Sequence, residues 1–264
     1  MEARIYEWLS APDPSSNYNK ARELCHPRTG SWFLQSKQFA KWKWEENSFL
    51  WLYGIPGCGK TILSSTIVEN ITNSSQQRPD DATYFNSGPS VLHFYFDFND
   101  VDKQSHEKMI RSLIMQLSTQ NETIPQPLMS AYASCVNGQR QPTTDALLET
   151  LRYLIQGYQN VFLILDALDE CTERLELLST LNQIAGWKLG TRILVTSRRE
   201  AEIGENLDLI GTEKICIQSN LVDNDIRAYI RERLSNDWKL RRWKKHPAIQ
   251  DEIEKTLMEK SGGM

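Results

Sequence analysis

The stretch from Ser48 to Thr61 constrains this chain more than any other. An apolar run, Phe49–Tyr53, leads directly into the segment 54–61, which reads GIPGCGKT. This order matches the phosphate-binding pattern of two glycines separated by four residues and followed by Lys and then Ser or Thr. The sequence therefore predicts a buried strand, a phosphate-binding loop and a helix in succession.

Each residue type in this loop has a task in binding phosphate. The glycines let several backbone N–H groups turn inward, because glycine reaches positive φ without steric cost. The helix expected near Lys60 aims its N-terminal N–H groups at the same phosphates. Lys60 suits the β- and γ-phosphates, and the Thr61 hydroxyl suits magnesium. The predicted nucleotide-binding residues are Gly54, Pro56, Gly57, Cys58, Gly59, Lys60, Thr61 and Ile62.

A second motif, VFLILDALDEC at residues 161–171, supplies acids. Its apolar strand ends in Asp166, and Asp169 and Glu170 follow within one turn. A carboxylate at the carboxyl end of a strand beside a phosphate loop can hold magnesium, and another can polarise the attacking water. We predict Asp166 and Thr61 as magnesium ligands. Asp169 and Glu170 are the candidate catalytic acids, with Asp169 the first choice for the base; the alternative is a solvated acidic turn.

Composition limits the class of protein. The chain has 264 residues, of which 40% are hydrophobic, enough for one large α/β core and a small appendage. A net charge of −4 makes nucleic-acid binding unlikely. No apolar run approaches the ~20 residues of a membrane span, and the N-terminus lacks the apolar core of a signal peptide. These features predict a cytoplasmic protein without a membrane span.

Cysteine usage favours a reducing compartment. The five cysteines are widely spaced and form no CxxC pair, so neither a zinc site nor a disulfide framework is indicated. Cys58 lies inside the phosphate loop, where a positive field lowers a thiol pKa. We expect Cys58 to be a tolerated small residue; the alternative is an oxidation-sensitive thiol.

Short apolar runs alternate with helical patterns from Ser48 onward. Such runs are typical of parallel strands that are covered on both faces. The alternation predicts a doubly wound parallel α/β sheet with its ligand at the carboxyl ends of the strands. The polar segment Asn73–Ser90 is predicted to be a surface loop. The candidate strands are Phe49–Gly54, Val91–Phe98, Val161–Asp166, Arg192–Ser197 and Lys214–Gln218.

Helical segments flank this nucleotide-binding domain, which we place at residues 48–218. Residues 1–47 are predicted to form a lead-in with short helices at Tyr18–Leu24 and Gly30–Trp44, and its aromatic residues are expected to pack on the core; a partner-docking surface is the alternative. Residues 219–264 are expected to begin a helical domain that is truncated. There the basic run Lys239–His246 is predicted to be a solvated loop, with nucleic acid or anionic lipid contact as the alternative.

Three motifs in this order resemble the NACHT domains of the STAND class of P-loop NTPases. They are WLYGIPGCGKT, LILDALDE with a small residue after its first Asp, and ILVTSRRE. The lead-in HPRTGSWFLQSKQFAKW is similar to the segment before the NACHT module in fungal NOD-like proteins, also described as a nephrocystin-type N-terminal NTPase module. The resemblance covers residues 19–264.

The resemblance implies a three-layer P-loop NTPase with a five-stranded parallel sheet of the additional-strand class, in the order 5-1-4-3-2. One strand is then inserted between the Walker A and Walker B strands. Arg198 matches the sensor arginine that contacts the γ-phosphate, a task that suits the forked guanidinium, and Arg199 is the competing choice. Asp169 and Glu170 match the acids tied to hydrolysis, and Asp166 matches the Walker B acid.

The resemblance also implies a function. It predicts a slowly hydrolysing switch that binds ATP or ADP with Mg2+ and serves non-self recognition or cell death in a fungus. Protein partners or self-association through the NTPase module are expected, and related chains continue into repeats such as ankyrin. One alternative is a P-loop kinase or fast ATPase, although the segment 100–160 carries no evident arginine cluster for a substrate phosphate. Another is a degenerate scaffold that binds nucleotide without hydrolysing it, or binds none.

Overall fold

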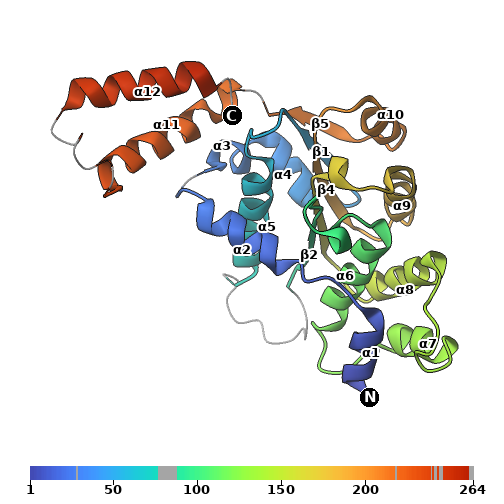
Figure 1. Ribbon diagram of the computed structural model, residues 1–264. Helices are drawn as coiled ribbons and strands as arrows, with labels where there is room; N and C mark the ends of the chain where they lie inside the picture. Colours follow the sequence, from blue (N-terminus) through green and yellow to red (C-terminus); the bar gives the residue numbers. More distant parts are fainter. Residues whose placement is uncertain are drawn as a thin grey trace.

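The computed structural model describes residues 1–27, 29–76, 88–217, 219–238, 240, 243 and 246–261 (Figure 1). Most of the predicted loop Asn73–Ser90 and of the basic run Lys239–His246 lies outside these ranges. In chain order the elements are α1 (Glu2–Leu9), α2 (Ser15–Leu24), α3 (Ser31–Leu34), α4 (Lys37–Trp44), β1 (Phe49–Tyr53), α5 (Lys60–Gln76), β2 (Ser90–Tyr95), the 3-10 helix η1 (Val101–Lys103), α6 (His106–Ser118), α7 (Gln126–Ser134), α8 (Thr144–Gln156), β3 (Val161–Asp166), the 3-10 helix η2 (Leu168–Glu170), α9 (Arg174–Gly186), β4 (Arg192–Ser197), α10 (Ala201–Leu209), β5 (Glu213–Cys216), α11 (Ser219–Asn236) and α12 (Pro247–Ser261).

The five strands form one parallel sheet in the order β2-β3-β4-β1-β5. Counted from the β5 edge this is 5-1-4-3-2, so the predicted order is confirmed. Strand β4 lies between β1 and β3, with Ile193 opposite Phe49 on one side and Leu163 on the other. Because all strands run the same way, the segments that follow β1, β3 and β4 meet at one edge of the sheet.

Helices cover both faces of the sheet, which explains the continuous apolar runs. Figure 1 shows α2, α4 and α5 on one side and α6, α8, α9 and α10 on the other. Side chains of β1 alternate between these layers: Leu50 and Leu52 pack with the α5 side, and Phe49 and Trp51 pack with the α6 side. All residues of β3 and β4 are buried. Packing on both faces holds the strands in place, and with them the edge of the sheet at which their carboxyl ends lie.

Three predicted strands have boundaries that differ from the structure: β1 ends at Tyr53 and not Gly54, and β2 and β5 each begin one residue earlier and end earlier than predicted. Strand β2 ends at Tyr95 instead of Phe98. Phe96 N–H still donates to Asp166 O at 3.1 Å, but Asp97 N–H turns away to Lys103 O at 3.2 Å. The apolar residues Phe96 and Phe98 thus continue the sequence pattern after the strand has ended. Strand β5 covers residues 213–216, and the predicted last residue, Gln218, lies outside the described ranges.

Helices α2 to α4 of the N-terminal segment pack on the α5 side of the core, whereas α1 packs on the α6 side. Among the aromatic residues of the N-terminal segment, Trp8, Phe33, Phe39 and Trp42 are buried, whereas the Trp44 side chain is 69% exposed. The Trp42 Nε1–H donates to Ile193 O at 2.8 Å, which ties this segment to β4. The predicted single helix over residues 30–44 was wrong. It is broken into α3 and α4, because the Ser36 side chain accepts from Phe39 N–H at 3.0 Å and starts a new helix.

The C-terminal helices α11 and α12 lie side by side and extend away from the sheet (Figure 1). Arg231 on α11 pairs with Glu254 on α12, with an Nε–Oε2 distance of 2.7 Å. Within the described ranges, no helix is both long and apolar enough to cross a bilayer.

Candidate functional site

The phosphate loop joins the end of β1 at Tyr53 to the start of α5 at Lys60. Gly57 and Gly59 have φ angles of 78° and 87°, in the left-handed region that favours glycine. A Cβ atom at Gly54 would lie 2.7 Å from Cys58 Sγ and 3.0 Å from Ile217 O, so this position has no room for a side chain. The three glycines therefore have structural reasons for their identity. Pro56 is exposed on the loop.

Lys60 folds back over the loop. Its Nζ donates to Gly54 O and Ile55 O, each at 3.0 Å, and lies 3.8 Å from Cys58 Sγ. Burial raises the pKa of the Cys58 thiol, and the opposing effect of Lys60 is smaller. The thiol form is therefore favoured, which argues against the oxidation-sensitive alternative for Cys58.

Asp166 at the end of β3 is buried behind the loop and accepts three hydroxyl hydrogen bonds. Thr61 Oγ1 donates to Oδ2 at 2.6 Å, and Ser64 Oγ and Thr196 Oγ1 both donate to Oδ1 at 2.7 Å. Burial raises the pKa of Asp166, and the three hydroxyls oppose this shift. The two predicted magnesium ligands, Thr61 and Asp166, are thus in direct contact.

Ser64 and Thr196 were not among the predicted site residues. Ser64 follows Thr61 by three positions on α5 and therefore shares its helix face, which is a signal that the sequence offered. Thr196 reaches Asp166 from β4, and its hydroxyl also accepts from Ala167 N–H at 3.0 Å. Its proximity depends on the insertion of β4 beside β3.

The turn after β3 places two further acids at the same edge. Ala167 has a φ of 58° in the left-handed region, which costs roughly 1–2 kcal/mol for a residue with a Cβ atom. The chain then forms η2, in which Leu168 is buried in the core and Asp169 and Glu170 stay near the carboxyl edge. Such local strain is typical of functional sites.

Asp169 and Glu170 have different surroundings. Both oxygens of Asp169 are engaged by Arg198, through the backbone N–H at 2.9 Å and through Nε at 3.0 Å. Glu170 is half-buried, and its Oε2 accepts from Phe98 N–H at 2.9 Å. Burial, followed by the nearby charges of Asp169, Asp97 and Asp166, raises the pKa of Glu170, while the Phe98 N–H lowers it. Both oxygens of Asp169 are thus engaged by Arg198, whereas the contact of Glu170 with Phe98 involves Oε2.

A cavity of about 320 Å³ adjoins the phosphate loop. Three segments far apart in sequence line it: residues 24–32, residues 57–63 and residues 217–229. Its wall is mainly apolar and aromatic, with Ile62, Trp32 and Tyr229 among the contributors, and Asp225 is the one carboxylate among the described residues that line it. A mainly apolar cavity with few polar groups suits a flat heterocycle. Of the predicted residues, Gly57, Cys58, Gly59 and Ile62 line this cavity.

Helix α11 is held against the N-terminal segment at this cavity. Asp225 Oδ2 accepts from Gly30 N–H at 2.7 Å. His26 contacts Glu232 through an ion pair and stacks edge-on against Tyr229, with ring centroids 6.4 Å apart. Burial raises the pKa of Asp225, and the Gly30 N–H opposes this shift. Sequence patterns did not indicate that Gly30 and Asp225, 195 positions apart, lie in the wall of the same cavity.

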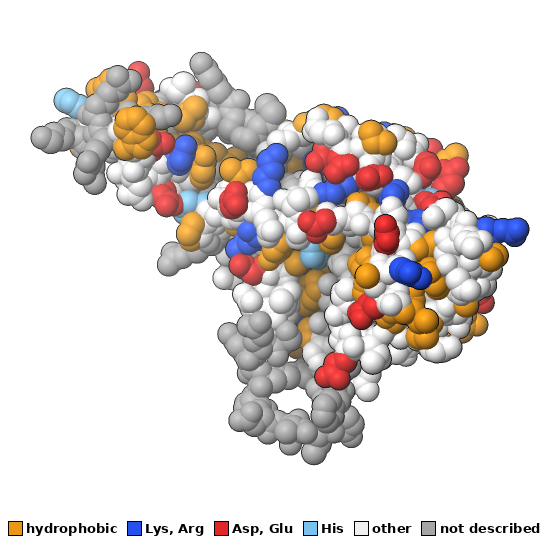
Figure 2. All heavy atoms as spheres, turned by 60° about the horizontal axis from the view of Figure 1, so that its bottom comes forward, with side chains coloured by type: hydrophobic (Ala, Val, Ile, Leu, Met, Phe, Trp, Pro, Cys, Tyr) orange, Lys and Arg blue, Asp and Glu red, His pale blue; other side chains and the backbone are white. Residues whose placement is uncertain are grey.

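The surface shows no single dominant charge on the face drawn in Figure 2. Lys and Arg side chains are scattered there among Asp and Glu side chains, and the described residues of this face form no continuous basic patch.

Comparisons with known proteins identify a family that matches most of this chain. Residues 28–198 match the family described as "Nephrocystin 3, N-terminal". The vegetative incompatibility protein HET-E-1 of Podospora anserina is 26% identical over 214 residues, which are 77% of this chain and 15% of that relative. The chain thus spans 15% of the length of this curated relative.

Solved structures show a weak likeness. A DNA replication initiation factor has a TM-score of 0.44 and 10% identity, over 92% of this chain and 59% of that one. The Aeropyrum pernix ORC1 protein, solved in complex with DNA, has a TM-score of 0.45 and 12% identity, over 94% and 62% of the two chains. At these scores the likeness carries no argument about function.

Proposed function

This chain belongs to the nephrocystin 3 N-terminal family, and from its site we propose that it is a slowly hydrolysing ATPase that acts as a nucleotide-dependent switch. One observation carries the proposal. The Thr61 hydroxyl of the phosphate loop and the buried Asp166 carboxylate lie 2.6 Å apart, directly beside a loop with two left-handed glycines. A fast P-loop ATPase would share these features, so the turnover rate separates it from the slow switch.

The residues at this contact fit Mg2+. A hydroxyl and a carboxylate are the hard oxygen donors that this ion prefers. Thr61 and Asp166 would hold it, directly or through water, and the bound ion would neutralise charge on the β- and γ-phosphates. Burial raises the pKa of Asp166, and a bound cation would oppose that shift by favouring the charged carboxylate.

Each remaining residue has a proposed role. Lys60 exchanges its two carbonyl partners for phosphate oxygens, which carry more charge. Glu170 accepts a proton from the attacking water. Asp169 holds Arg198, so that the guanidinium N–H groups not bound to Asp169 are available to the terminal phosphate. This assigns Glu170 the role of base, for which Asp169 was the first choice from sequence.

Nucleotide bound to the purified protein provides the first test. We expect near-stoichiometric ADP or ATP to be released on denaturation. For protein stripped of nucleotide, Mg2+ and ATP at a hundredfold excess over the dissociation constant should stabilise the fold by about 2.7 kcal/mol. Protein that carries no nucleotide and shows no shift in melting temperature with Mg2+ and ATP would contradict the proposal and favour a scaffold. Turnover well above ~1 per second would instead favour the fast-enzyme alternative.

We propose that the apolar cavity receives the base and sugar. Asp225→Ala removes the acceptor that holds α11 to Gly30 N–H, and a hydrogen bond to a charged group contributes about 1.5–3 kcal/mol. We expect roughly tenfold faster release of a fluorescent ADP analogue, measured by stopped flow. Asp223→Ala, on the same helix but outside the cavity wall, is the control. Equal release rates in the two variants would exclude this role of α11.

The wider role follows from the relative alone. HET-E-1 is named as a vegetative incompatibility protein, and we propose that this chain serves a comparable recognition of non-self within a longer protein. In that role, the nucleotide state would change the contacts of α11 with residues 24–32 and so the position of α12. Protein partners or self-association through this module are part of the proposal.

A further inference from the structure

The connection between β2 and α6, residues 96–105, contacts Glu170 through its backbone. Phe98 N–H donates to Glu170 Oε2 at 2.9 Å. The Phe98 side chain itself is 64% exposed, so packing of the ring does not fix this residue. Something else must hold the N–H group in place.

Gln104 holds this connection in place through both its side chain and its backbone. Its Nε2 donates to Phe98 O at 2.7 Å, which fixes the peptide next to the contact with Glu170. Its backbone O accepts from Thr172 N–H at 3.0 Å and from Thr172 Oγ1 at 3.2 Å. Gln104 thus links Phe98, which contacts Glu170, to Thr172, which follows Glu170 by two residues in the chain.

The far side of the connection is anchored by a buried cation. Lys103 is only 5% exposed, and its Nζ donates to Ser16 Oγ and Asn17 Oδ1 on α2. Asn17 Nδ2 donates in turn to Asp97 Oδ2 at 2.9 Å. These contacts hold the connection against the N-terminal segment.

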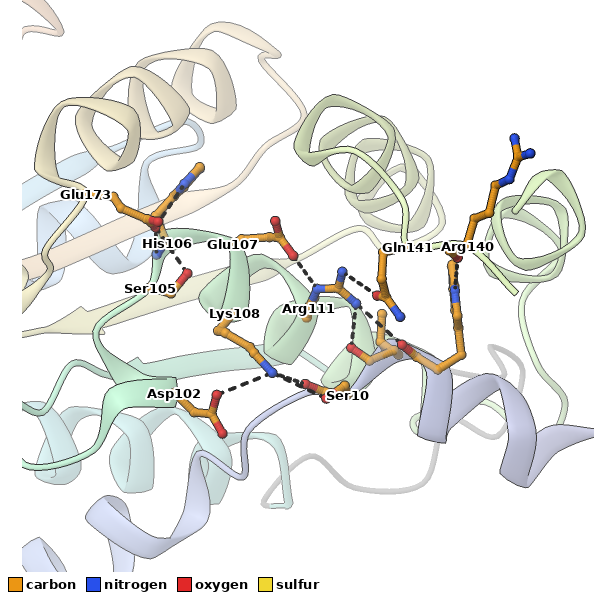
Figure 3. Close-up of polar contacts among 12 residues, drawn as sticks. Ser10, Asp102, Ser105, His106, Glu107, Lys108, Arg111, Arg140, Gln141 and Glu173 are labelled. Carbon is orange, nitrogen blue, oxygen red and sulfur yellow. Dashed lines mark hydrogen bonds and ion pairs between the residues drawn. The ribbon is translucent and has the colours of Figure 1, made fainter. Parts of the chain in front are cut away.

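Helix α6 completes the frame. Figure 3 shows Glu173 at the first residues of α6, where its Oε2 accepts from Ser105 Oγ at 3.1 Å and His106 N–H at 2.9 Å. On the same helix, Arg111 donates to Leu9 O at 2.9 Å and Lys108 donates to Ser10 O at 3.1 Å, at the end of α1. The acidic turn is therefore tied to a helix that is fixed at several points.

We propose that Gln104 is a positioning residue for hydrolysis, which keeps Phe98 N–H on Glu170 Oε2 and so fixes the carboxylate that accepts the proton. This inference rests on the proposed function. In the reaction, the water oxygen bonds to the γ-phosphorus while the bond to the β–γ bridging oxygen breaks and leaves its electrons on ADP. The water proton goes to Glu170. The second oxygen of Glu170 is left for the water, because Oε2 is held by the backbone.

The expected pH dependence has a definite sign. Glu170 acts as a base only when it is deprotonated, so the rate falls as the pH drops through its pKa. The Phe98 N–H lowers that pKa, against the raising effects of burial and of Asp169, Asp97 and Asp166. Loss of this hydrogen bond raises the pKa of Glu170 further. The acid limb of the rate profile then moves to higher pH.

Single-turnover ATP hydrolysis of Gln104→Ala, measured with Mg2+ across roughly pH 5 to 9, tests the inference. We expect a rate near neutral pH about tenfold below wild type, an acid limb shifted to higher pH, and an unchanged dissociation constant for nucleotide. Gln104→Met keeps the length of the side chain without its donor and should behave alike, even if the alanine variant folds poorly. Gln126→Ala, at an exposed position on α7, is the matched control.

The outcomes separate this inference from the proposed function. Wild-type rates at every pH in both Gln104 variants would overturn it. A lower rate with an unshifted pH profile would overturn it too, because a merely structural role gives that result. If wild type binds nucleotide but hydrolyses none, the hydrolytic part of the proposed function fails and this inference fails with it, while nucleotide binding stands. Absence of nucleotide binding in wild type contradicts the proposed function itself.

Discussion

Lys60→Ala is expected to weaken the binding of Mg2+ and ATP by roughly a hundredfold, which is about 2.7 kcal/mol. The Lys60 ammonium is a full positive charge that lies over the phosphate loop, 3.0 Å from each of two of its carbonyl oxygens. The remaining backbone N–H groups keep a weak site. Isothermal titration of nucleotide-free protein measures the change, and a purified Lys60→Ala variant should contain no nucleotide.

The control for this variant is Lys37→Ala, which removes an exposed lysine at the start of α4. We expect wild-type affinity from the control. Affinity within threefold of wild type in Lys60→Ala would show that the loop does not bind the triphosphate.

Glu170→Gln is expected to lower the single-turnover rate by about 10²–10⁴-fold while nucleotide binding is retained. The amide keeps an oxygen for the Phe98 N–H but is a very weak proton acceptor. Asp169→Asn is expected to cost less, because both oxygens of Asp169 hold Arg198 and do not face the water in the proposed mechanism. Rapid-quench measurements on both variants give the comparison.

Either of two results would contradict this assignment. A larger loss in Asp169→Asn than in Glu170→Gln would return the role of base to Asp169, the first choice from the sequence. Equal losses would mean that neither residue alone accepts the proton.

Much of the fold was predictable because both faces of the sheet are covered. Buried parallel strands such as β3 read as unbroken apolar runs, and the resemblance to a known family supplied the strand order, which the structure confirms. The recognition of a nephrocystin-type module is likewise confirmed by the family match. Element ends were less predictable. The end of β2 and the break at Ser36 depend on single hydrogen bonds that apolar patterns do not reveal.

Some residues of the candidate site could be predicted from the sequence and others could not. Lys60, Thr61 and Asp166 belong to contiguous motifs, and the sequence could place them together. Thr196 and Asp225 reach the site only because β4 is inserted beside β3 and because α11 folds back onto Gly30. Thr196 lies in the quoted motif ILVTSRRE, but the sequence does not show that its hydroxyl points to Asp166, and Asp225 belongs to no motif. Long-range contacts of this kind follow from the tertiary fold and not from local pattern.

The sheet order has a consequence for the growing chain on the ribosome. Strand β1, which carries the phosphate loop, has β4 and β5 as its two neighbours, and these are translated some 140 and 160 residues later. Until residue 197 has emerged, β1 has neither partner strand, and the nascent loop lacks the support that shapes it. Residues 217–229, which close the cavity, emerge later still. In the proposed function, tight retention of nucleotide would therefore require that synthesis has passed α11, and a bound nucleotide would mark that the two distant parts of the chain have met.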